Sequence, residues 1–340
     1  MKGTRIILDE LSGRHVAALM IDGQLHDLLV APDDTAPPAP GAVFRAIADR
    51  PLKGQGGMIM RLPDGETALL RNAKGLAPGQ PLLVQVTSYA ETGKAVPVTD
   101  RLVFKGRNAI ITPGAKGLNV SRQIRDDDLR ETLLEALHNS DASETKHGVI
   151  VRSNAGEAEP DDISDEVDGL LSLVDQILSD KTTTPELLFD APGPHDLAWR
   201  DWPKAETVQG FATHGVFDDL AMLETTKVTI GSVHLFIEPT RALVAVDVNT
   251  GGDFSPAAGL KANLAAARTL PRQLRLRGLG GQIVLDLAPM AKKDRKQFET
   301  TLRSAFRADT VETSLVGWTP LGHFELQRKR ERLALPRGLT

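Results

Sequence analysis

Residues 243–249 read Leu-Val-Ala-Val-Asp-Val-Asn and residues 283–287 read Ile-Val-Leu-Asp-Leu, so two short apolar stretches each run into an aspartate. Short runs of valine, isoleucine and leucine predict buried strands. The Ala-, Leu- and Arg-rich segment between them, roughly residues 257–277, predicts a helix. The region is therefore expected to form a strand–helix–strand unit with both strands in one sheet.

The two aspartates are the first candidate site. A carboxylate in an apolar strand is costly to bury without a partner, so Asp247 and Asp286 predict a hard cation at neighbouring strand ends. Asn249 lies two residues beyond Asp247 and projects from the same face. Two carboxylates suffice for Mg²⁺, which keeps several waters, and such an ion supports phosphoryl chemistry. The alternative is that each aspartate only caps the loop after it.

Length and composition narrow the class of protein. A chain of 340 residues predicts two to four compact units. The absence of cysteine excludes disulfides and thiolate zinc sites and suits a reducing compartment, so we expect a cytoplasmic protein. The N-terminal apolar run is too short for a signal peptide, and no stretch of 18 apolar residues predicts a membrane span.

Charge is unevenly distributed along the chain. From Arg241 onward there are 17 Lys and Arg against 9 Asp and Glu, although the whole chain carries −5. A basic C-terminal third is typical of proteins that bind a polyanion. Arg272 and Arg275 on the predicted helix are candidates for contacts with RNA phosphates. The alternative is a solvated helix face.

The N-terminal part predicts β-structure. Residues 4–30 alternate as short strands, with Asp22-Gly23 as a hairpin signal, and residues 31–41 form a Pro-rich linker. Strands with Gly-rich turns at 43–48, 57–62, 67–70 and 82–86 are typical of a small barrel of the OB type. Further strands are predicted at 109–112, 147–151, 227–230 and 232–238, and helices at 126–139, 160–180, 217–223 and 292–308.

Arg152 and Ser153 follow the predicted strand at 147–151 and precede a turn. A guanidinium beside a hydroxyl at such a place can bind a phosphate through charge-assisted hydrogen bonds. The alternative is an exposed arginine beside a turn serine.

Taken together, these segments resemble the bacterial ribonuclease E/G family. The most specific stretch is Ala242–Met290, which includes the two aspartate strands, Gly251-Gly252-Asp253 and the run from Arg272 to Gly281. The similarity extends to Arg5–Leu29, Ser121–Ile124, Gly148–Gly156 and Leu321–Arg330.

The resemblance implies an α+β multi-domain fold. A discontinuous ribonuclease-H-like subdomain would contain an inserted OB-fold barrel and a sensor for the RNA 5′ monophosphate, followed by a deoxyribonuclease-I-like catalytic subdomain. The expected boundaries are 1–38 and 189–222 for the ribonuclease-H-like parts, 39–104 for the barrel, 105–188 for the sensor-like domain and 223–340 for the catalytic domain.

The resemblance also implies a function, that of a metal-dependent endoribonuclease that leaves a 5′ phosphate and a 3′ hydroxyl. Residues that match Asp247 and Asp286 hold Mg²⁺ in the family, with Mn²⁺ as a substitute, and the one that matches Asn249 assists. Arg152-Ser153 corresponds to the Arg-Thr pair of the family's sensor. The remaining implied sites are the sensor pocket, Gly106 and Ile110, and the RNA contacts, Lys94, Arg122, Arg272 and Arg275.

Departures from the family pattern set further expectations. This sequence shows no match to the family's Cys-based zinc link and small dimerisation domain, so we expect no zinc, and we expect a homodimer rather than a tetramer. Met58-Ile59-Met60 and Leu69-Leu70 stand where the family offers aromatic platforms for base stacking, so weaker binding of single-stranded RNA is expected. Glu312 stands where a basic residue completes the family sensor.

Two other hypotheses remain open. The first is a non-catalytic RNA-binding or RNA-processing accessory protein with the same fold, which would bind RNA without cleaving it. The second is a metal-dependent phosphodiesterase that acts on a small nucleotide. The basic C-terminal third favours a polymeric substrate over a small nucleotide.

Overall fold

We describe the protein from a computed structural model of the whole chain, which covers residues 3–52, 54, 56–138, 140–253, 255 and 257–339. These residues divide into two compact units. Unit 1 comprises residues 1–35 and 205–340, and unit 2 comprises residues 36–204. The predicted boundaries of five domains are finer than this division and stay a prediction.

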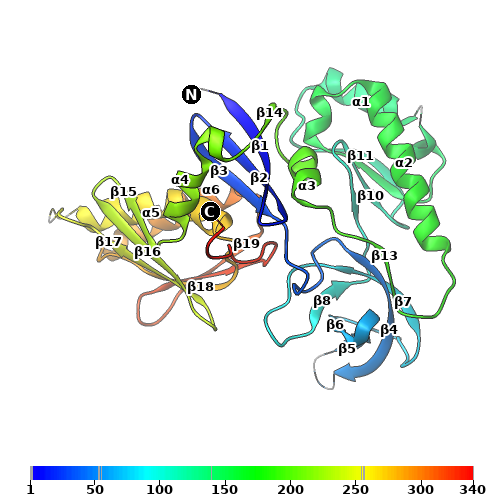
Figure 1. Cartoon of the computed structure of the whole chain (residues 1–340), viewed down its shortest axis with the longest axis horizontal. Helices are drawn as coiled ribbons and strands as arrows, with labels where there is room; N and C mark the ends of the chain where they lie inside the picture. Colours follow the sequence, from blue (N-terminus) through cyan, green and yellow to red (C-terminus); the bar gives the residue numbers. More distant parts are fainter. Residues whose placement is uncertain are drawn as a thin grey trace. The chain divides into compact units, whose positions relative to one another are not determined.

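Unit 1 contains two sheets (Figure 1). The N-terminal residues form an antiparallel meander, and a strand from the far side of the insertion pairs in parallel with its first strand. These strands are β1 (Thr4–Leu11), β2 (Arg14–Ile21), β3 (Gln24–Val30) and β14 (Glu206–Gln209). Helix α4 (Val216–Leu223) packs on this sheet through Val216 and Leu220. The chain thus returns to its own N-terminal sheet after residue 204.

The second sheet of unit 1 carries the two aspartates. Its order is β15-β16-β17-β18-β20-β19, and only the central pair β17–β18 is parallel. The strands are β15 (Lys227–Ile230), β16 (Val233–Pro239), β17 (Val244–Asn249), β18 (Gly281–Asp286), β19 (Thr313–Trp318) and β20 (Phe324–Arg328). Helix α5 (Ala258–Leu276) connects β17 to β18, and helix α6 (Arg295–Arg307) connects β18 to β19.

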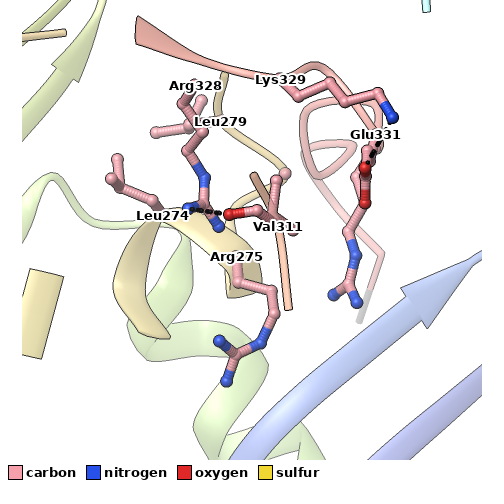
Figure 2. Close-up of a pocket in the computed structure, with 9 residues that line it drawn as sticks. Leu274, Arg275, Leu279, Val311, Arg328, Lys329 and Glu331 are labelled. Atoms are coloured by element: carbon pink, nitrogen blue, oxygen red, sulfur yellow. Dashed lines mark hydrogen bonds and ion pairs between the residues drawn. The ribbon is translucent and has the colours of Figure 1, made fainter. Parts of the chain in front are cut away.

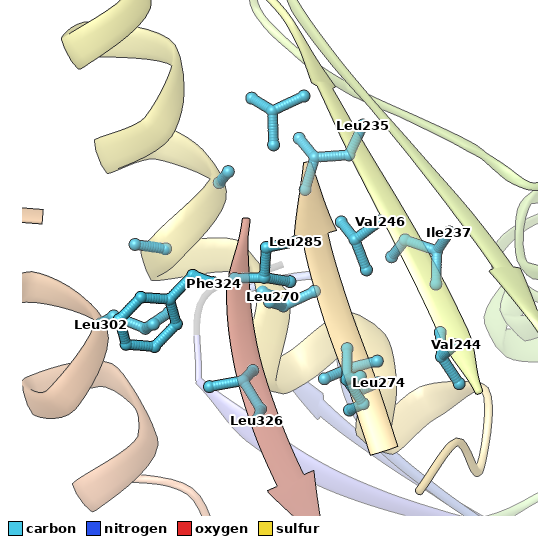
Figure 3. Packing of buried hydrophobic residues seen from close by; sticks show 14 of the residues in the cluster. Leu235, Ile237, Val244, Val246, Leu270, Leu274, Leu285, Leu302, Phe324 and Leu326 are labelled. Carbon is cyan, nitrogen blue, oxygen red and sulfur yellow. The ribbon is translucent and has the colours of Figure 1, made fainter. Parts of the chain in front are cut away.

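Both helices cover the same face of this sheet. Alternate residues of β16, β17, β18 and β20 point into a core shared with α5 and α6, as Figure 3 shows for Leu235, Val246 and Leu285; Leu302 of α6 belongs to the same core. The intervening residues of β17 and β18 are partly or fully exposed. This alternation, with period two, is the pattern of a sheet with one packed and one open face.

Unit 2 contains a five-stranded barrel of the OB-like kind. The first strand, β4, is long: its second half pairs with β5, and its first half pairs with β7 and so closes the barrel. The strands are β4 (Val43–Leu52), β5 (Gly57–Arg61), β6 (Thr67–Leu70), β7 (Pro81–Val86) and β8 (Val96–Thr99), and β13 (Glu186–Phe189) adds to the edge of β4. The structure therefore confirms the predicted small barrel of OB-like architecture.

The rest of unit 2 is a small mixed sheet covered by helices. Its strands, in the order β11-β12-β10-β9, are β9 (Phe104–Lys105), β10 (Ala109–Thr112), β11 (Gly117–Val120) and β12 (Gly148–Val151). Helices α1 (Asp127–His138) and α2 (Pro160–Ser179) bury their apolar faces against it. Helix α3 (Pro194–Asp201) ends the unit.

The predicted α+β class and the strands and helices expected from sequence are confirmed, with bounds that differ by a few residues. The elements that sequence patterns did not predict are short or irregular: β8, β9, β11, β13, β14, β19, β20 and α3. None of the helices in the described ranges is long and apolar enough to cross a membrane.

Candidate functional site

Asp247 and Asp286 lie directly opposite each other on the two central strands. In the parallel pairing of β17 with β18, the Cα atom of Asp247 is the partner of the Cα atom of Asp286. Both side chains project from the open face, because their neighbours Val246, Val248 and Leu285 are buried on the other side. The expected convergence of the two strand ends is thus present in the fold.

The premise that these carboxylates are buried was wrong. The side chain of Asp286 is 69% exposed, and Asp247 is also exposed. The strands look apolar because Val and Leu occupy the packed face and small or apolar residues such as Ala245 and Val284 share the open one. Desolvation therefore does not require a cation here, and the case for one rests on the pairing of two carboxylates across neighbouring strands.

Two further side chains contact this pair. The Asn249 amide donates a hydrogen bond from Nδ2 to Oδ2 of Asp247, at 2.7 Å. On the other side, Nδ1 of His323 lies 3.3 Å from Oδ1 of Asp286, and the His323 side chain is 36% exposed. Asn249 was expected at the site, whereas His323 was not.

The loop after Asp286 is held by a buried amide. Asn263, on α5, is fully buried; its Nδ2 donates to the Ala288 carbonyl at 2.8 Å, and its Oδ1 accepts from the Ala288 amide at 3.0 Å. Gly259 lies one turn earlier, and a Cβ there would sit 1.8 Å from the Pro289 carbonyl oxygen. Close approach of α5 to this loop thus fixes the chain just beyond Asp286.

The donor chemistry of the open face fits a hard divalent cation. Mg²⁺ is commonly held by one or two carboxylates, with water in its remaining positions. Among the side chains that the structure describes, no three from His, Asp and Glu already surround one point. The Mg²⁺ or Mn²⁺ site at Asp247 and Asp286 therefore stays a prediction.

Arg152 is engaged within unit 2. Its guanidinium forms an ion pair with Asp201 at 2.7 Å and donates to the carbonyls of Gly106 and Arg200. Burial works to raise the pKa of the Asp201 carboxyl, but the hydrogen bonds and charges of Arg200 and Arg152 outweigh it and hold the pKa below its ordinary value. The structure thus brings Arg152 to Gly106, as expected, but with a carboxylate beside the guanidinium.

A second carboxylate supports the same loop. Glu166, on α2, accepts hydrogen bonds from the amides of Asn108 and Ala109 and from the Asn108 side chain, at 2.8–3.1 Å. A Cβ on Gly106 would meet Glu166 Oε1 at 2.0 Å, so a larger residue there would displace the Glu166 carboxylate from these hydrogen bonds. The roles of Gly106, Ile110, Arg152 and Ser153 in binding a 5′ phosphate stay predictions.

The other predicted RNA-contacting residues differ in how accessible their side chains are. Arg122 is exposed, and Lys94 is 66% exposed and paired with Glu91. Arg272 donates to Gln24, and Arg275 is only 13% exposed, pairs with carboxylates and donates to the His26 carbonyl. These contacts give Arg275 a structural role and engage its guanidinium within unit 1. Its RNA-binding role stays a prediction.

Arg275 belongs to a buried charge network in unit 1. Asp309 pairs with Arg275 and, at 2.7 Å, with Arg328, and Asp27 pairs with Arg275 and Arg332. Burial lowers the pKa of Arg328 to about 10. Arg275 and Arg328 line a pocket of about 10 Å³, which holds at most one water. Figure 2 shows both side chains among the residues that line it. This cavity is part of the packing of the network and not a ligand site.

The sequence did not indicate a role for His323 or Asn263, for different reasons. Asn263 is a polar residue among the small apolar residues of a predicted helix, and that placement was a usable signal for a buried side chain that binds a backbone segment. His323 is adjacent to β20, a strand that the sequence pattern did not predict. No local signal places that histidine opposite Asp286.

Comparisons with known proteins agree with the fold. The model of the Ribonuclease E/G family matches residues 103–211 and 203–331. Ribonuclease E of Nostoc sp. (strain PCC 7120) is 26% identical over 93% of this chain and 54% of its own length. Ribonuclease G of Salmonella typhimurium (strain SL1344) is 27% identical, and ribonuclease G of Escherichia coli K12 is 28% identical, each over 75% of this chain and 60% of the relative. The chain thus spans about half to three fifths of the length of these relatives.

Proposed function

The chain belongs to the ribonuclease E/G family, and we propose that it is a metal-dependent endoribonuclease that cleaves single-stranded RNA in RNA processing or decay. Cleavage would leave a 5′ phosphate and a 3′ hydroxyl. The observation that supports this most directly is the pairing of Asp247 with Asp286 across β17 and β18 on an open sheet face. We further propose that the sheet of β1–β3 and β14 is ribonuclease-H-like and the sheet of β15–β20 deoxyribonuclease-I-like.

The chain's own residues would prepare the site for a divalent cation. Asp247 and Asp286 would hold Mg²⁺, which when bound stabilises charge on a phosphodiester and lowers the pKa of a water. Asn249 donates to one oxygen of Asp247, which orients that carboxylate and leaves its other oxygen available. The Asn263 clamp keeps the loop beyond Asp286 in place. The open face admits a polymer, which need not thread into a closed pocket.

The barrel is proposed to contribute RNA affinity mainly through charge. Met58, Met60 and Leu70 lie in its core, and the paired residues Ile59 and Leu69 offer no aromatic ring for stacking. Stacking on aromatic side chains is worth about 1–3 kcal/mol per base, so affinity without it should be modest and strongly salt-dependent.

A cleavage assay with matched variants tests the proposal. Asp247→Asn and Asp286→Asn should each slow Mg²⁺-dependent cleavage of a fluorescent single-stranded RNA by at least ~10³-fold, because several kcal/mol of charge stabilisation would be lost. Glu238→Gln serves as the control and should leave the rate unchanged. Glu238 is an exposed carboxylate on the neighbouring strand β16, two residues beyond Phe236, the partner of Asp247. Equal rates for the Asp247 variant and the original protein would refute the assignment. RNA binding without cleavage at any Mg²⁺ or Mn²⁺ concentration would favour the accessory-protein alternative.

A further inference from the structure

Three polar side chains form a row across adjacent strands of the aspartate sheet. Asp247 on β17 is directly opposite Asp286 on β18. On the other side of β18, Leu285 pairs with Phe324 in antiparallel register, so the next position along places His323 opposite Asp286. Strands β17, β18 and β20 are consecutive in the sheet. Side chains at directly opposite positions have Cβ atoms about 4.5–5.5 Å apart, so each neighbouring pair of the row lies within reach of one ion. In the described structure the three groups do not yet surround one point, so binding would draw them together by rotamer changes.

The contact between His323 and Asp286 has the spacing of two neighbouring metal ligands. Their Nδ1 and Oδ1 atoms are 3.3 Å apart. Donors at adjacent positions of an octahedral ion with bonds of about 2.0–2.1 Å are about 3 Å apart. Neither side chain is buried, so each can adjust its rotamer over the open face.

The backbone of His323 is fixed where this role needs it. Its amide donates to the Thr319 hydroxyl at 3.1 Å, and its carbonyl accepts from the Thr319 amide at 2.8 Å. The Gly322 amide donates to the Thr319 carbonyl at 3.0 Å and closes the turn between β19 and β20. The turn thus presents the imidazole at the end of β20 without any contribution from the metal.

We propose that His323 is the third protein ligand of the metal centre, through Nδ1, together with Asp247 and Asp286. This inference rests on the proposed function, since it concerns the same cation. A set of two carboxylates and one imidazole favours first-row transition metals more than a carboxylate set does, because imidazole nitrogen is a softer ligand than oxygen. The centre should therefore prefer Mn²⁺ to Mg²⁺, and His323 should carry part of that preference.

His234 supplies a matched control on the same face. It lies on β16 opposite Asn249, and its Nδ1 is 3.3 Å from the Thr229 hydroxyl. It therefore faces the amide end of the site and a neighbouring threonine, whereas His323 contacts a carboxylate. A variant at His234 removes an imidazole from the same sheet face without removing the proposed ligand.

The test uses Mn²⁺ bound to the full chain and reads the ligand atoms directly. Pulsed electron paramagnetic resonance should show modulation from a coordinated imidazole ¹⁴N, which His323→Leu and His323→Gln abolish and His234→Leu preserves. Both His323 variants should weaken Mn²⁺ binding by at least ~10-fold, with a smaller loss for Mg²⁺, since even outer ligand contacts contribute about 10–100-fold to metal affinity. Circular dichroism should show that all the variants remain folded.

The outcomes separate this inference from the proposed function. If Mn²⁺ binds, is lost in Asp247→Asn and shows no nitrogen modulation, His323 is not a ligand and the two-aspartate centre stands. Modulation that disappears only in the His234 variant would also overturn the inference. If Mn²⁺ binding is unchanged by Asp247→Asn, the proposed metal centre itself is wrong.

Discussion

Replacing Asp309 by asparagine should strongly destabilise unit 1. Asp309 follows α6, and its carboxylate pairs with Arg275 on α5 and Arg328 on β20. The side chains of Asp309 and Arg328 are each 1% exposed, so water cannot replace the lost partner. The substitution keeps the shape of the side chain, removes its charge and replaces one of the two acceptor oxygens that face the arginines by an NH2 donor.

The expected cost follows from the charges that remain. Removing one partner of a buried ion pair typically costs about 3–5 kcal/mol, because the other charge is left without compensation. Arg275 would keep Asp27, whereas Arg328 would keep hydrogen bonds to neutral groups of the described residues, the Thr313 hydroxyl at 2.8 Å and the Val311 carbonyl at 3.5 Å. We therefore expect the free energy of unfolding of unit 1 to fall by about 3–5 kcal/mol.

Urea unfolding can be monitored by hydrogen exchange of peptides from β18 and β20, which measures the stability of unit 1 separately from that of unit 2. Glu206→Gln is the control, because it breaks the more exposed Arg5–Glu206 pair of the same unit and should cost at most ~1 kcal/mol. Adding Arg328→Met to Asp309→Asn should recover stability, since an apolar replacement of a buried pair is often close to neutral. A loss for Asp309→Asn no larger than that of the control would refute the reasoning.

Three further predictions concern Asp201, which pairs with Arg152, and the loop beyond Asp286. Asp201→Asn should increase any preference for 5′-monophosphorylated over 5′-hydroxyl RNA in a cleavage assay, because Arg152 loses its internal carboxylate; an unchanged ratio of rates would contradict this. The pKa of Asp201 is lowered, so its ion pairs with Arg152 and Arg200 contribute their full stability above the ordinary carboxyl pKa of about 3.9. This contribution is lost as the pH falls through the lowered pKa. Urea unfolding between about pH 2 and 5 should therefore show a shallower loss of stability in Asp201→Asn than in the original protein. Asn263→Ala should reduce the unfolding free energy by about 2–4 kcal/mol and weaken Mg²⁺ binding, since both backbone groups of Ala288 lose buried partners; full Mg²⁺ affinity in this variant would count against the clamp.

Local patterns in the sequence were enough to predict the central strands and helices. The alternation around Asp247 and Asn249 identified one strand face, and the Ala-, Leu- and Arg-rich composition of the segment between the aspartates predicted the connecting helix α5. The barrel strands were recognised for the same reason, because turn residues and strand periodicity depend on neighbours in the chain. Strand β9, with two residues, is too short for such a pattern. Strand β20 carries a buried arginine, Arg328, at an inward position, so its sequence does not read as an apolar strand.

The sequence by itself determined the strand–helix–strand unit, the pairing of its two aspartates and the family that they indicate. Only the tertiary structure decided that the aspartates face solvent, that His323 joins their row, and that Arg152 and Arg275 have carboxylate partners. The reason is physical: side-chain direction along a strand follows from local geometry, whereas burial and ion pairing depend on which distant segments pack together. Asp27 and Arg332, more than 300 residues apart, form a pair that no local pattern encodes.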